Sequence, residues 1–305
     1  MIVLFIGVGS IAKKHIAVLL KQYKVIEIIA LRSSSQAGTI DNIKNIYNIN
    51  ELTVQPDFIV ISNPTANHID AIKLAITLRK PLFIEKPLSH HLQNIDELIT
   101  EINKANIKTY IACNLRFLDC LTFLKAYLEA NKCLINEVNA YCGSYLPDWR
   151  PTTDYTKSYS ANIQMGGGVN LDLIHELDYI YWLFGKPTQF SKHLSQKSTL
   201  KINAPDNANY FLEYETFNAS IILNYYRKDA KRTLEVIFDN DTWLIDILQN
   251  NIISTLTGNV IFTSQQKIID TYYLQMNYFI NSINGNVQPM NAINEAKEVL
   301  EICLN

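Results

Sequence analysis

The chain has 305 residues, of which 18% are charged and 48% hydrophobic, and its formal net charge at pH 7 is −2. A chain of this length predicts two domains of about 100–200 residues each. The near-neutral charge gives no electrostatic reason to expect nucleic acid or an anionic membrane as a partner. No apolar run reaches the ~18 residues that a membrane span requires.

The cysteines and histidines give no pattern of a metal site or a disulfide framework. The five cysteines are odd in number, and no two of them have CxxC spacing. We therefore expect free thiols, a reducing compartment and a cytoplasmic protein. The six histidines lack a third ligand at metal-site spacing, so no metal is predicted.

The first half of the chain alternates predicted strands and helices. The apolar segment 2–7 indicates a buried strand and not a secretion signal, and a helix follows it to about residue 21. Further strands are expected at 24–32, 57–63, 81–87 and 107–114, with helices at 68–80 and 94–106. Apolar strands separated by helices predict a doubly wound α/β fold, with a parallel sheet whose ligand lies at the carboxyl ends of the strands.

A glycine motif lies between the first strand and the first helix. The segment Gly7-Val8-Gly9-Ser10-Ile11-Ala12 has the GxGxxG/A pattern. Gly7 allows a tight turn, Gly9 lets the backbone approach a pyrophosphate, and Ala12 lets helix and strand pack closely. The position of the motif favours dinucleotide binding, with Ser10 and Ile11 at the helix start. The alternative is a glycine turn that holds no ligand.

The end of the second strand should hold the residue that contacts the cofactor ribose. An acidic residue there would select the free 2′-hydroxyl, but this chain has Arg32 followed by Ser33. A guanidinium and a hydroxyl suit a 2′-phosphate, which favours NADP over NAD. The alternative is that Arg32 is a solvated loop charge and another side chain contacts the ribose.

The next two strand ends carry further candidates. After the strand at 57–63, Pro64 keeps Asn63 out of helical geometry, and we expect Asn63, Pro64, Thr65 and His68 near the cofactor. After the strand at 81–87 come Glu85, Lys86 and Pro87, where a lysine could donate a hydrogen bond to a substrate oxygen. For these charges the alternative is an exposed ion pair in a loop.

The segment 170–185 has two faces at helical spacing. One is an apolar stripe, and the other carries Asp172, His175, Glu176 and Tyr179, just after the run Gly166–Gly168. This polar face is either an ordinary solvated surface or a set of acid and base groups aimed into a cleft. Oxidation of an alcohol needs a base for the hydroxyl proton, and histidine suits that task.

The remaining segments predict a second domain rich in strands. The loop at 143–168 includes Trp149 and Arg150, which could contact a sugar ring and an anionic group, or could pack as a structural arm. Strands are expected at 134–142, 209–217, 219–227, 233–239, 242–248 and 251–263, and helices at 266–284 and 291–303. The aromatic residues Tyr225 and Tyr226 are assigned to packing or an interface. An open antiparallel sheet favours a homodimer or homotetramer.

Taken together, these motifs resemble the Gfo/Idh/MocA family, which includes relatives of glucose–fructose oxidoreductase and inositol dehydrogenase. The order is GxGxxA, Glu-Lys-Pro, NLRF at 114–117, and then three glycines followed by Asp, His and Asp, so the resemblance covers residues 1 to about 185. It implies an N-terminal Rossmann domain, 1–116, with a doubly wound parallel sheet. It also implies a C-terminal α+β substrate and oligomerisation domain, 117–305, with a large, open, mostly antiparallel sheet.

The resemblance also implies a function and residue roles. Family members use NAD or NADP to oxidise or reduce a hydroxyl or carbonyl carbon of a sugar or cyclitol. Lys86 would lie near substrate and cofactor, His175 would be the acid/base, and Asp172 would help to hold the substrate. Asn114 and Glu85 are expected near the cofactor and Arg116 near the substrate. Two residues separate Asp172 from His175 where the family usually has three, and Asp178 is the better match to a second acid that orients the imidazole.

Two other functions stay open. The chain could be a non-catalytic sensor of a dinucleotide or sugar, because this fold does not dictate chemistry. It could also be an NAD-dependent glycosidase that oxidises its substrate transiently. Lys86 and His175 argue against a sensor, since a sensor needs neither. The favoured substrate is a small sugar or sugar derivative, with phosphorylated and nucleotide-activated sugars included.

Overall fold

The chain divides into two compact units. The computed structural model describes residues 1–24, 26–34, 43–287 and 290–305. The first unit joins residues 1–113 to 269–297, and the second joins 114–268 to 298–305. We expected a single boundary at 116/117, which lies close to the first of these breaks. The segment 269–297, which we placed in the second domain, belongs to the first unit, so the chain leaves this unit and returns to it.

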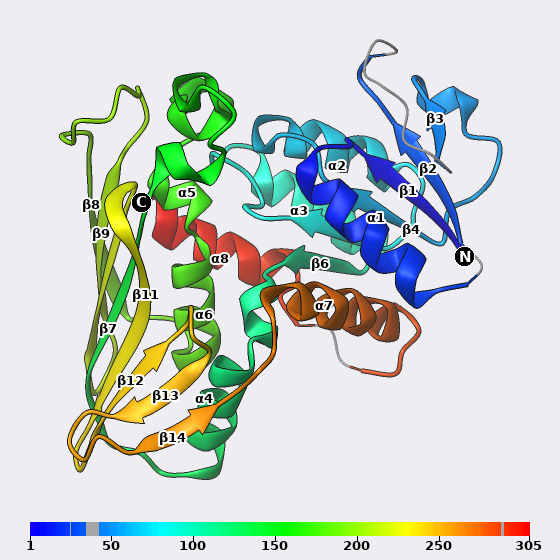
Figure 1. Ribbon diagram of the computed structural model, residues 1–305. Coiled ribbons are helices and arrows are strands. Elements are labelled where there is room, and N and C mark those ends of the chain that lie inside the picture. The colour runs from blue at the N-terminus through cyan, green and yellow to red at the C-terminus, as the bar shows by residue number, and fades with distance from the viewer. Residues whose placement is uncertain (25, 35–42, 288–289) are drawn as a thin grey trace. The chain divides into compact units, whose positions relative to one another are not determined.

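The first unit is built on a parallel sheet of six strands in the order β3-β2-β1-β4-β5-β6. Its strands are β1 (Ile2–Ile6), β2 (Glu27–Leu31), β3 (Lys44–Ile46), β4 (Phe58–Ile61), β5 (Leu82–Glu85) and β6 (Thr109–Ala112). Its helices are α1 (Ser10–Gln22), α2 (His68–Ile76), α3 (Ile95–Lys104) and nearly all of α7 (Ile268–Ile283). Figure 1 shows α1 and α7 on one face of the sheet and α2 and α3 on the other.

Burial explains why this sheet is parallel and covered on both sides. Every residue of β4, β5 and β6 is buried, so neither face of these strands meets water. Phe279 of α7 packs edge-on against Phe58 of β4 and Phe83 of β5, with ring centroids 5.2 and 5.4 Å apart. The expected doubly wound sheet is therefore confirmed, and its strand ends carry the cofactor candidates.

The second unit contains a mostly antiparallel sheet of eight strands in the order β14-β13-β12-β11-β7-β10-β9-β8, in which only the pair β7–β10 is parallel among the described residues. The strands are β7 (Ile135–Tyr145), β8 (Gln189–Ser195), β9 (Asn207–Glu213), β10 (Asn218–Asn224), β11 (Tyr226–Phe238), β12 (Thr242–Asp246), β13 (Asn251–Ser254) and β14 (Val260–Thr263). Its helices are α4 (Asp119–Ala130), α5 (Val169–Asp172) and α6 (His175–Phe184), and α8 (Ile293–Leu304) contributes residues to both units.

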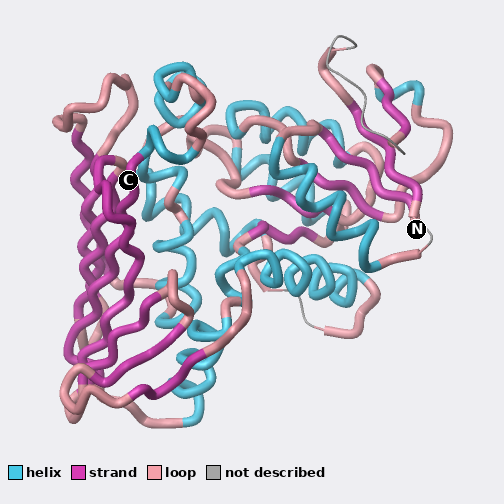
Figure 2. Tube along the Cα trace, viewed as in Figure 1, coloured by secondary structure: helices cyan, strands magenta, loops and turns pink. Residues whose placement is uncertain are grey.

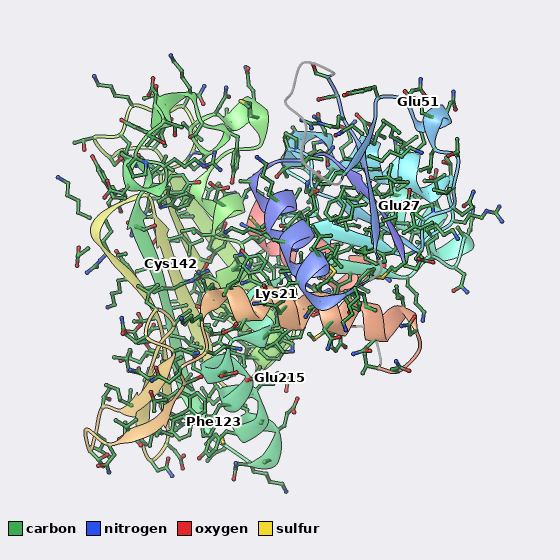
Figure 3. The ribbon with its side chains drawn as sticks, turned by 45° about the vertical axis from the view of Figure 1, so that its right-hand side comes forward. Lys21, Glu27, Glu51, Phe123, Cys142 and Glu215 are labelled. Atoms are coloured by element: carbon green, nitrogen blue, oxygen red, sulfur yellow. The ribbon has the colours of Figure 1, made fainter. Side chains whose placement is uncertain are left out.

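The helices of the second unit cover one face of its sheet, as Figure 2 shows. At one end of that face an aromatic cluster joins helix to sheet: Phe123 of α4, labelled in Figure 3, stacks on Phe262 of β14 with centroids 4.7 Å apart. On the other face Phe211 and Ile222 are 41% and 39% exposed. The large open sheet that we expected is therefore confirmed.

Two elements differ from their predicted form. The segment 251–263, which we expected to be one strand, is the pair β13 and β14 joined by a turn in which Gly258 has a φ of +74°. The segment 170–185, which we expected to be one helix, is interrupted: α5 ends at Asp172 and α6 begins at His175. Leu173, with φ −99° and ψ 27°, leaves helical geometry between them.

Candidate active site

The glycine motif forms a tight turn between β1 and α1. Gly7 has a φ of +88°, and a Cβ added there would lie 2.5 Å from the Cα of Asn63, so both its backbone angle and its neighbour require glycine. Ser62, which follows β4, donates a hydrogen bond of 2.9 Å from Oγ to the Gly7 carbonyl. By contrast, a Cβ added at Gly9 meets nothing within 4 Å. The turn is thus closed on the strand side and open beside Gly9.

The residues present fit a dinucleotide pyrophosphate at this turn. Gly9 is the N-cap of α1, its cap makes no side-chain hydrogen bond, and the first turn of the helix has no acidic residue. The first N–H groups of α1 and the helix dipole therefore favour an anion. Ser10 is exposed and Ile11 half-buried, while Ala12 is fully buried against the sheet. This is the arrangement that the motif predicts.

Arg32 lies directly after β2, where the ribose of a bound dinucleotide is expected. Its backbone N–H donates to the Ile46 carbonyl at 2.9 Å, and its Nη1 donates to Oδ1 of Asn45 on β3 at 3.2 Å. Ser33 beside it is exposed. The contact with Asn45 orients the guanidinium at the edge of the sheet.

The loop after β4 presents a buried acceptor with no partner among the described residues. Nδ2 of Asn63 donates to the Asn67 carbonyl at 3.0 Å, whereas its Oδ1 is buried and unpaired there. Such an orphaned acceptor suits a hydroxyl donor of a bound ribose. Pro64 is exposed, and Thr65 begins the short 3₁₀ turn Thr65–Asn67.

Two residues that we expected near the cofactor are buried. His68 is 1% exposed, and its two ring nitrogens lie 2.9 and 3.0 Å from the carbonyl oxygens of Pro87 and Asn63. Burial lowers the pKa of His68, although these hydrogen bonds and the charge of Glu85 oppose that change. Glu85 is 8% exposed and its Oε1 lies 2.5 Å from Nε2 of His15. Lys86, between Glu85 and Pro87, is half-buried.

In the second unit, Asp172 is bound by a tyrosine that we had assigned to packing. Asp172 ends α5, is 6% exposed, and its Oδ2 accepts a hydrogen bond of 2.5 Å from the hydroxyl of Tyr225. Burial raises the pKa of Tyr225 well above its usual value, and the charge of Asp172 raises it further. The same two causes raise the pKa of Tyr159, which also interacts with this carboxylate.

The two tyrosines link Asp172 to the loop residues predicted to bind substrate. The ring of Trp149 is edge-on to that of Tyr225, with centroids 5.4 Å apart, and the guanidinium of Arg150 lies 5.8 Å from the ring centre of Tyr159. Trp149 is 39% exposed, and Arg150 is exposed as well. One carboxylate, one indole face and one cation therefore lie around two phenols, of which Tyr225 is buried and Tyr159 half-buried.

The polar face that begins at His175 is not a solvated surface. Glu176 and Tyr179 are both fully buried, and Oε1 of Glu176 lies 2.5 Å from Nε of Arg232 on β11. Burial is the largest single influence on the pKa of Arg232 and lowers it, but the charge of Glu176, the hydrogen bond to Glu176 and other nearby groups together raise it by more, so the net shift is upward. Only His175, at the first position of α6, stays half-buried. Of the two interpretations open for this face, the solvated one is wrong.

Arg116 and Asp178 form a buried ion pair. Nε and Nη2 of Arg116 donate to the two carboxylate oxygens of Asp178 at 2.9 and 2.6 Å, and the residues are 1% and 2% exposed. We expected Arg116 near the substrate and Asp178 near His175. Their contacts are those of a bidentate structural pair. Asn114, 4% exposed, begins the 3₁₀ turn Asn114–Phe117 that carries Arg116.

The described residues contain neither a metal-binding cluster nor a membrane-spanning helix. No group of His, Cys, Asp or Glu side chains there is arranged to hold a metal ion. Within the same residues, no helix combines the length and the apolar character that crossing a membrane would require. The five cysteines are all free thiols, and four of them are buried.

Comparison with protein families covers both units. Residues 1–112 match the family described as an oxidoreductase family with an NAD-binding Rossmann fold, and residues 134–243 match the Gfo/Idh/MocA C-terminal domain. The chain belongs to the Gfo/Idh/MocA family. The resemblance drawn from the motifs is therefore confirmed, together with its two-part α/β architecture.

Two curated proteins resemble parts of the chain. The uncharacterized oxidoreductase YrbE of Bacillus subtilis is 26% identical over 190 residues, which are 59% of this chain and 52% of that protein. Myo-inositol 2-dehydrogenase of Thermotoga maritima is 27% identical over 134 residues, 44% of this chain and 37% of that enzyme. The chain thus spans about half the length, or less, of these relatives.

Solved structures with the same fold cover nearly the whole chain. UDP-N-acetylglucosamine 3-dehydrogenase GnnA from Acidithiobacillus ferrooxidans has a TM-score of 0.80 at 16% identity and covers 100% of this chain and 95% of its own. The WlbA dehydrogenase from Bordetella pertussis, in complex with NADH and UDP-GlcNAcA, has a TM-score of 0.83 at 15% identity. The match covers 98% of this chain and 93% of the WlbA chain. At such identities the likeness establishes the fold.

Proposed function

We propose that this Gfo/Idh/MocA protein is an NAD(P)-dependent oxidoreductase. It would transfer a hydride between the nicotinamide and a hydroxyl or carbonyl carbon of a sugar or sugar derivative, phosphorylated and nucleotide-activated sugars included. The observation that carries the proposal is that both family domains are present and each retains a reactive residue. Lys86 follows β5 in the first unit, and His175 begins α6 in the second, close in sequence to Asp172.

The three residues have complementary roles. The cofactor, when bound, supplies or accepts the hydride. The ammonium of Lys86 donates a hydrogen bond to the reacting oxygen and stabilises the negative charge that develops on it. His175 accepts the hydroxyl proton during oxidation and returns it during reduction. Asp172 accepts a hydrogen bond from a substrate hydroxyl, with its carboxylate oriented by Tyr225.

The cofactor contacts follow the strand ends of the first unit. The segment Gly7–Ala12 would hold the pyrophosphate, and Asn63 would face the ribose through its unpaired Oδ1. Pro64, Thr65 and Asn114 stay predicted contacts. We propose NADP as the preferred cofactor, because Arg32 and Ser33 occupy the end of β2 where an acidic residue would select NAD.

Names of relatives support the substrate class. Two are myo-inositol 2-dehydrogenases, from Thermotoga maritima and Lactobacillus plantarum, and GnnA is a UDP-N-acetylglucosamine 3-dehydrogenase. The Lactobacillus enzyme has a TM-score of 0.79 at 19% identity and covers 99% of this chain and 95% of its own. Trp149 offers an aromatic face to a sugar ring, and Arg150 offers a cation to an anionic substituent. We assign both to the substrate side, and Arg116 stays a predicted contact.

We also propose a homodimer or homotetramer built through the sheet of the second unit. The sheet face opposite its helices bears a shallow hollow that includes Phe211 and Ile222, both substantially exposed. A second copy of the chain would remove this apolar surface from water. A monomeric mass by light scattering would contradict this proposal. The free thiols support a cytoplasmic, reducing compartment.

The test begins with cofactor binding and continues with a substrate screen. Calorimetry with NADPH and NADH should show binding of one or both. Inositols, sugars, sugar phosphates and UDP-sugars are then screened by following the absorbance of reduced nicotinamide. Absence of cofactor binding would overturn the proposal, and binding without turnover on any substrate would favour a sensor. Sugar cleavage with no net absorbance change would indicate the glycosidase instead.

Variants then test the residue roles. Lys86→Ala and His175→Ala should each retain cofactor binding and lose turnover by at least ~100-fold. The matched controls are Lys73→Ala, on the exposed side of α2, and His193→Ala, on the exposed side of β8, which should keep wild-type rates. Near-wild-type turnover in either site variant would remove its assigned role.

A further inference from the structure

Two buried histidines contact the residues on either side of Lys86. Nε2 of His15, on α1, lies 2.5 Å from Oε1 of Glu85. Nδ1 of His68, at the start of α2, lies 2.9 Å from the carbonyl oxygen of Pro87. Since α1 and α2 cover opposite faces of the sheet (Figure 1), the two contacts reach the end of β5 from both sides. Lys86 is the residue between them.

Each histidine also belongs to the cofactor segments. His15 lies one turn after Ala12, on the helix that begins at the glycine motif. Nε2 of His68 lies 3.0 Å from the carbonyl oxygen of Asn63, and the Asn63 backbone occupies the space where Gly7 lacks a Cβ. A continuous set of contacts therefore connects the glycine turn, through Asn63 and His68, to the residue after Lys86.

Both histidine rings are buried, so neither can act at the protein surface. His15 is 0% exposed and packs edge-on to Phe83 with centroids 5.0 Å apart. Nε2 of His15 faces the Glu85 carboxylate, and Nδ1 has no partner among the described residues. Both rings are packed inside the unit, so they act on the site through the backbone and side chains that they hold.

We propose that His15 and His68 are positioning residues that set the placement of Lys86. His15 fixes the Glu85 carboxylate, His68 fixes the Pro87 carbonyl, and together they determine where the intervening residue directs its ammonium. The same contacts transmit the placement of the glycine turn and the Asn63 loop to Lys86. The inference rests on the proposed function in one respect: it takes Lys86 as the group that contacts the reacting oxygen.

The direct test measures Lys86 itself in the protein without cofactor or substrate. Lysines are labelled briefly with an amine-reactive acetylating reagent, and the rate at each lysine is read by peptide mass spectrometry. His15→Leu and His68→Leu should each change the Lys86 rate by at least ~3-fold, because the placement and surroundings of a lysine set its reactivity. The Lys73 rate should stay constant in the same samples, and His193→Leu should leave both rates unchanged.

Conservative variants separate positioning from a general loss of stability. His15→Gln retains an N–H donor for Glu85 and should restore most of the wild-type Lys86 rate. Glu85→Ala should reproduce the effect of His15→Leu, and the double variant should be no worse than either single one, since the two residues act through one contact. All rates are measured well below the unfolding temperature of the least stable variant.

Two results of the labelling experiment would overturn the proposal. A Lys86 rate unchanged in folded His15→Leu and His68→Leu proteins would overturn the proposal, as would additive effects of His15→Leu and Glu85→Ala. Once a substrate is known, both leucine variants should lower kcat by at least ~10-fold, and in His15→Leu, where the contact between His68 and Asn63 is kept, the Kd for the cofactor should change less than ~3-fold. If the wild-type protein binds no NADPH or NADH, the proposed function fails, whereas the labelling result stands by itself.

Discussion

The hydroxyl of Tyr225 donates a 2.5 Å hydrogen bond to Asp172, although 53 residues separate them in sequence. Asp172 ends α5, and Tyr225 follows β10, the strand that runs parallel to β7. The sheet therefore fixes the tyrosine, and the tyrosine fixes the carboxylate. A carboxylate held in this way keeps one direction for its second oxygen, which is what substrate binding requires.

Tyr225→Phe should therefore destabilise the second unit. Loss of a hydrogen bond to a buried charged group is expected to lower the free energy of unfolding by about 1.5–3 kcal/mol. Urea denaturation followed by circular dichroism measures it. The matched control is Tyr226→Phe at the next position, which is 41% exposed and should cost less than ~0.5 kcal/mol. Equal losses in the two variants would contradict the importance of this bond.

Alanine should have different effects at the two glycines of the first turn. It should lower stability at Gly7 and weaken cofactor binding at Gly9. At Gly7, the φ of +88° and the 2.5 Å approach to Asn63 predict that Gly7→Ala lowers the free energy of unfolding by at least ~2 kcal/mol. Gly9→Ala meets open space, so it should fold normally and yet weaken NADPH or NADH binding at least ~10-fold, since the methyl group would enter the path of the pyrophosphate. Calorimetric binding and thermal unfolding distinguish the two effects. Full cofactor affinity in Gly9→Ala would exclude this turn as the pyrophosphate site.

Much of the first unit could be predicted because its signals are local. Short apolar runs such as 58–61 and 82–84 are buried along their whole length, and a glycine motif at a strand end is specific through its position. The predictions missed two strands that lack such signals and one helix. The strand β3 is three residues long, and β8, an edge strand of sequence QFSKHLS, has no buried residue. The helix α4 carried a helical apolar pattern, with Leu121 and Leu124 buried, that we did not assign.

The chemistry of the second unit could be predicted only in part. Motif order located Asp172 and His175, but no local pattern pairs Tyr225 with Asp172 or Glu176 with Arg232, which are 53 and 56 residues apart. These partners come from strands β10 and β11 and their connection, and their side chains meet the helices only once the sheet is built. From sequence alone, a charged residue on a helix next to an apolar stripe is expected to be exposed to solvent, because its buried partner cannot be identified.

Breaking the Arg116–Asp178 pair should be costly. Asp178→Asn leaves a buried guanidinium without its counter-charge, and the free energy of unfolding should fall by about 3–5 kcal/mol. Replacing both residues by apolar ones, Arg116→Met with Asp178→Leu, should recover much of that loss. Lys157→Met, at the exposed pair with Asp154, is the control and should leave stability unchanged. Urea unfolding of the four proteins decides whether the pair is structural.

Arg32→Ala should change cofactor preference rather than cofactor binding as a whole. Loss of a charge-assisted contact to a 2′-phosphate should weaken NADPH binding by about 10–100-fold, while NADH binding changes less than ~3-fold. Calorimetry at two salt concentrations measures both affinities. Lys44→Ala, at an exposed lysine of β3, is the control for loss of a nearby positive charge. Equal weakening of both cofactors would remove the assigned role of Arg32.

The buried ring of His68 should make the first unit sensitive to acid. Burial lowers the pKa of His68 in the folded protein, whereas the unfolded chain has the ordinary value near ~6.5. Below that pH the unfolded state binds a proton that the folded state does not bind. The free energy of unfolding therefore falls as the pH drops toward the folded pKa. His68→Gln has no such proton to bind, and its stability should decline less between about pH 7 and pH 5 than that of the wild type. Urea unfolding across this range measures how the free energy of unfolding of each protein changes with pH. His193→Gln, at an exposed histidine, is the control. An equal change with pH in the wild type and in His68→Gln would contradict the lowered pKa.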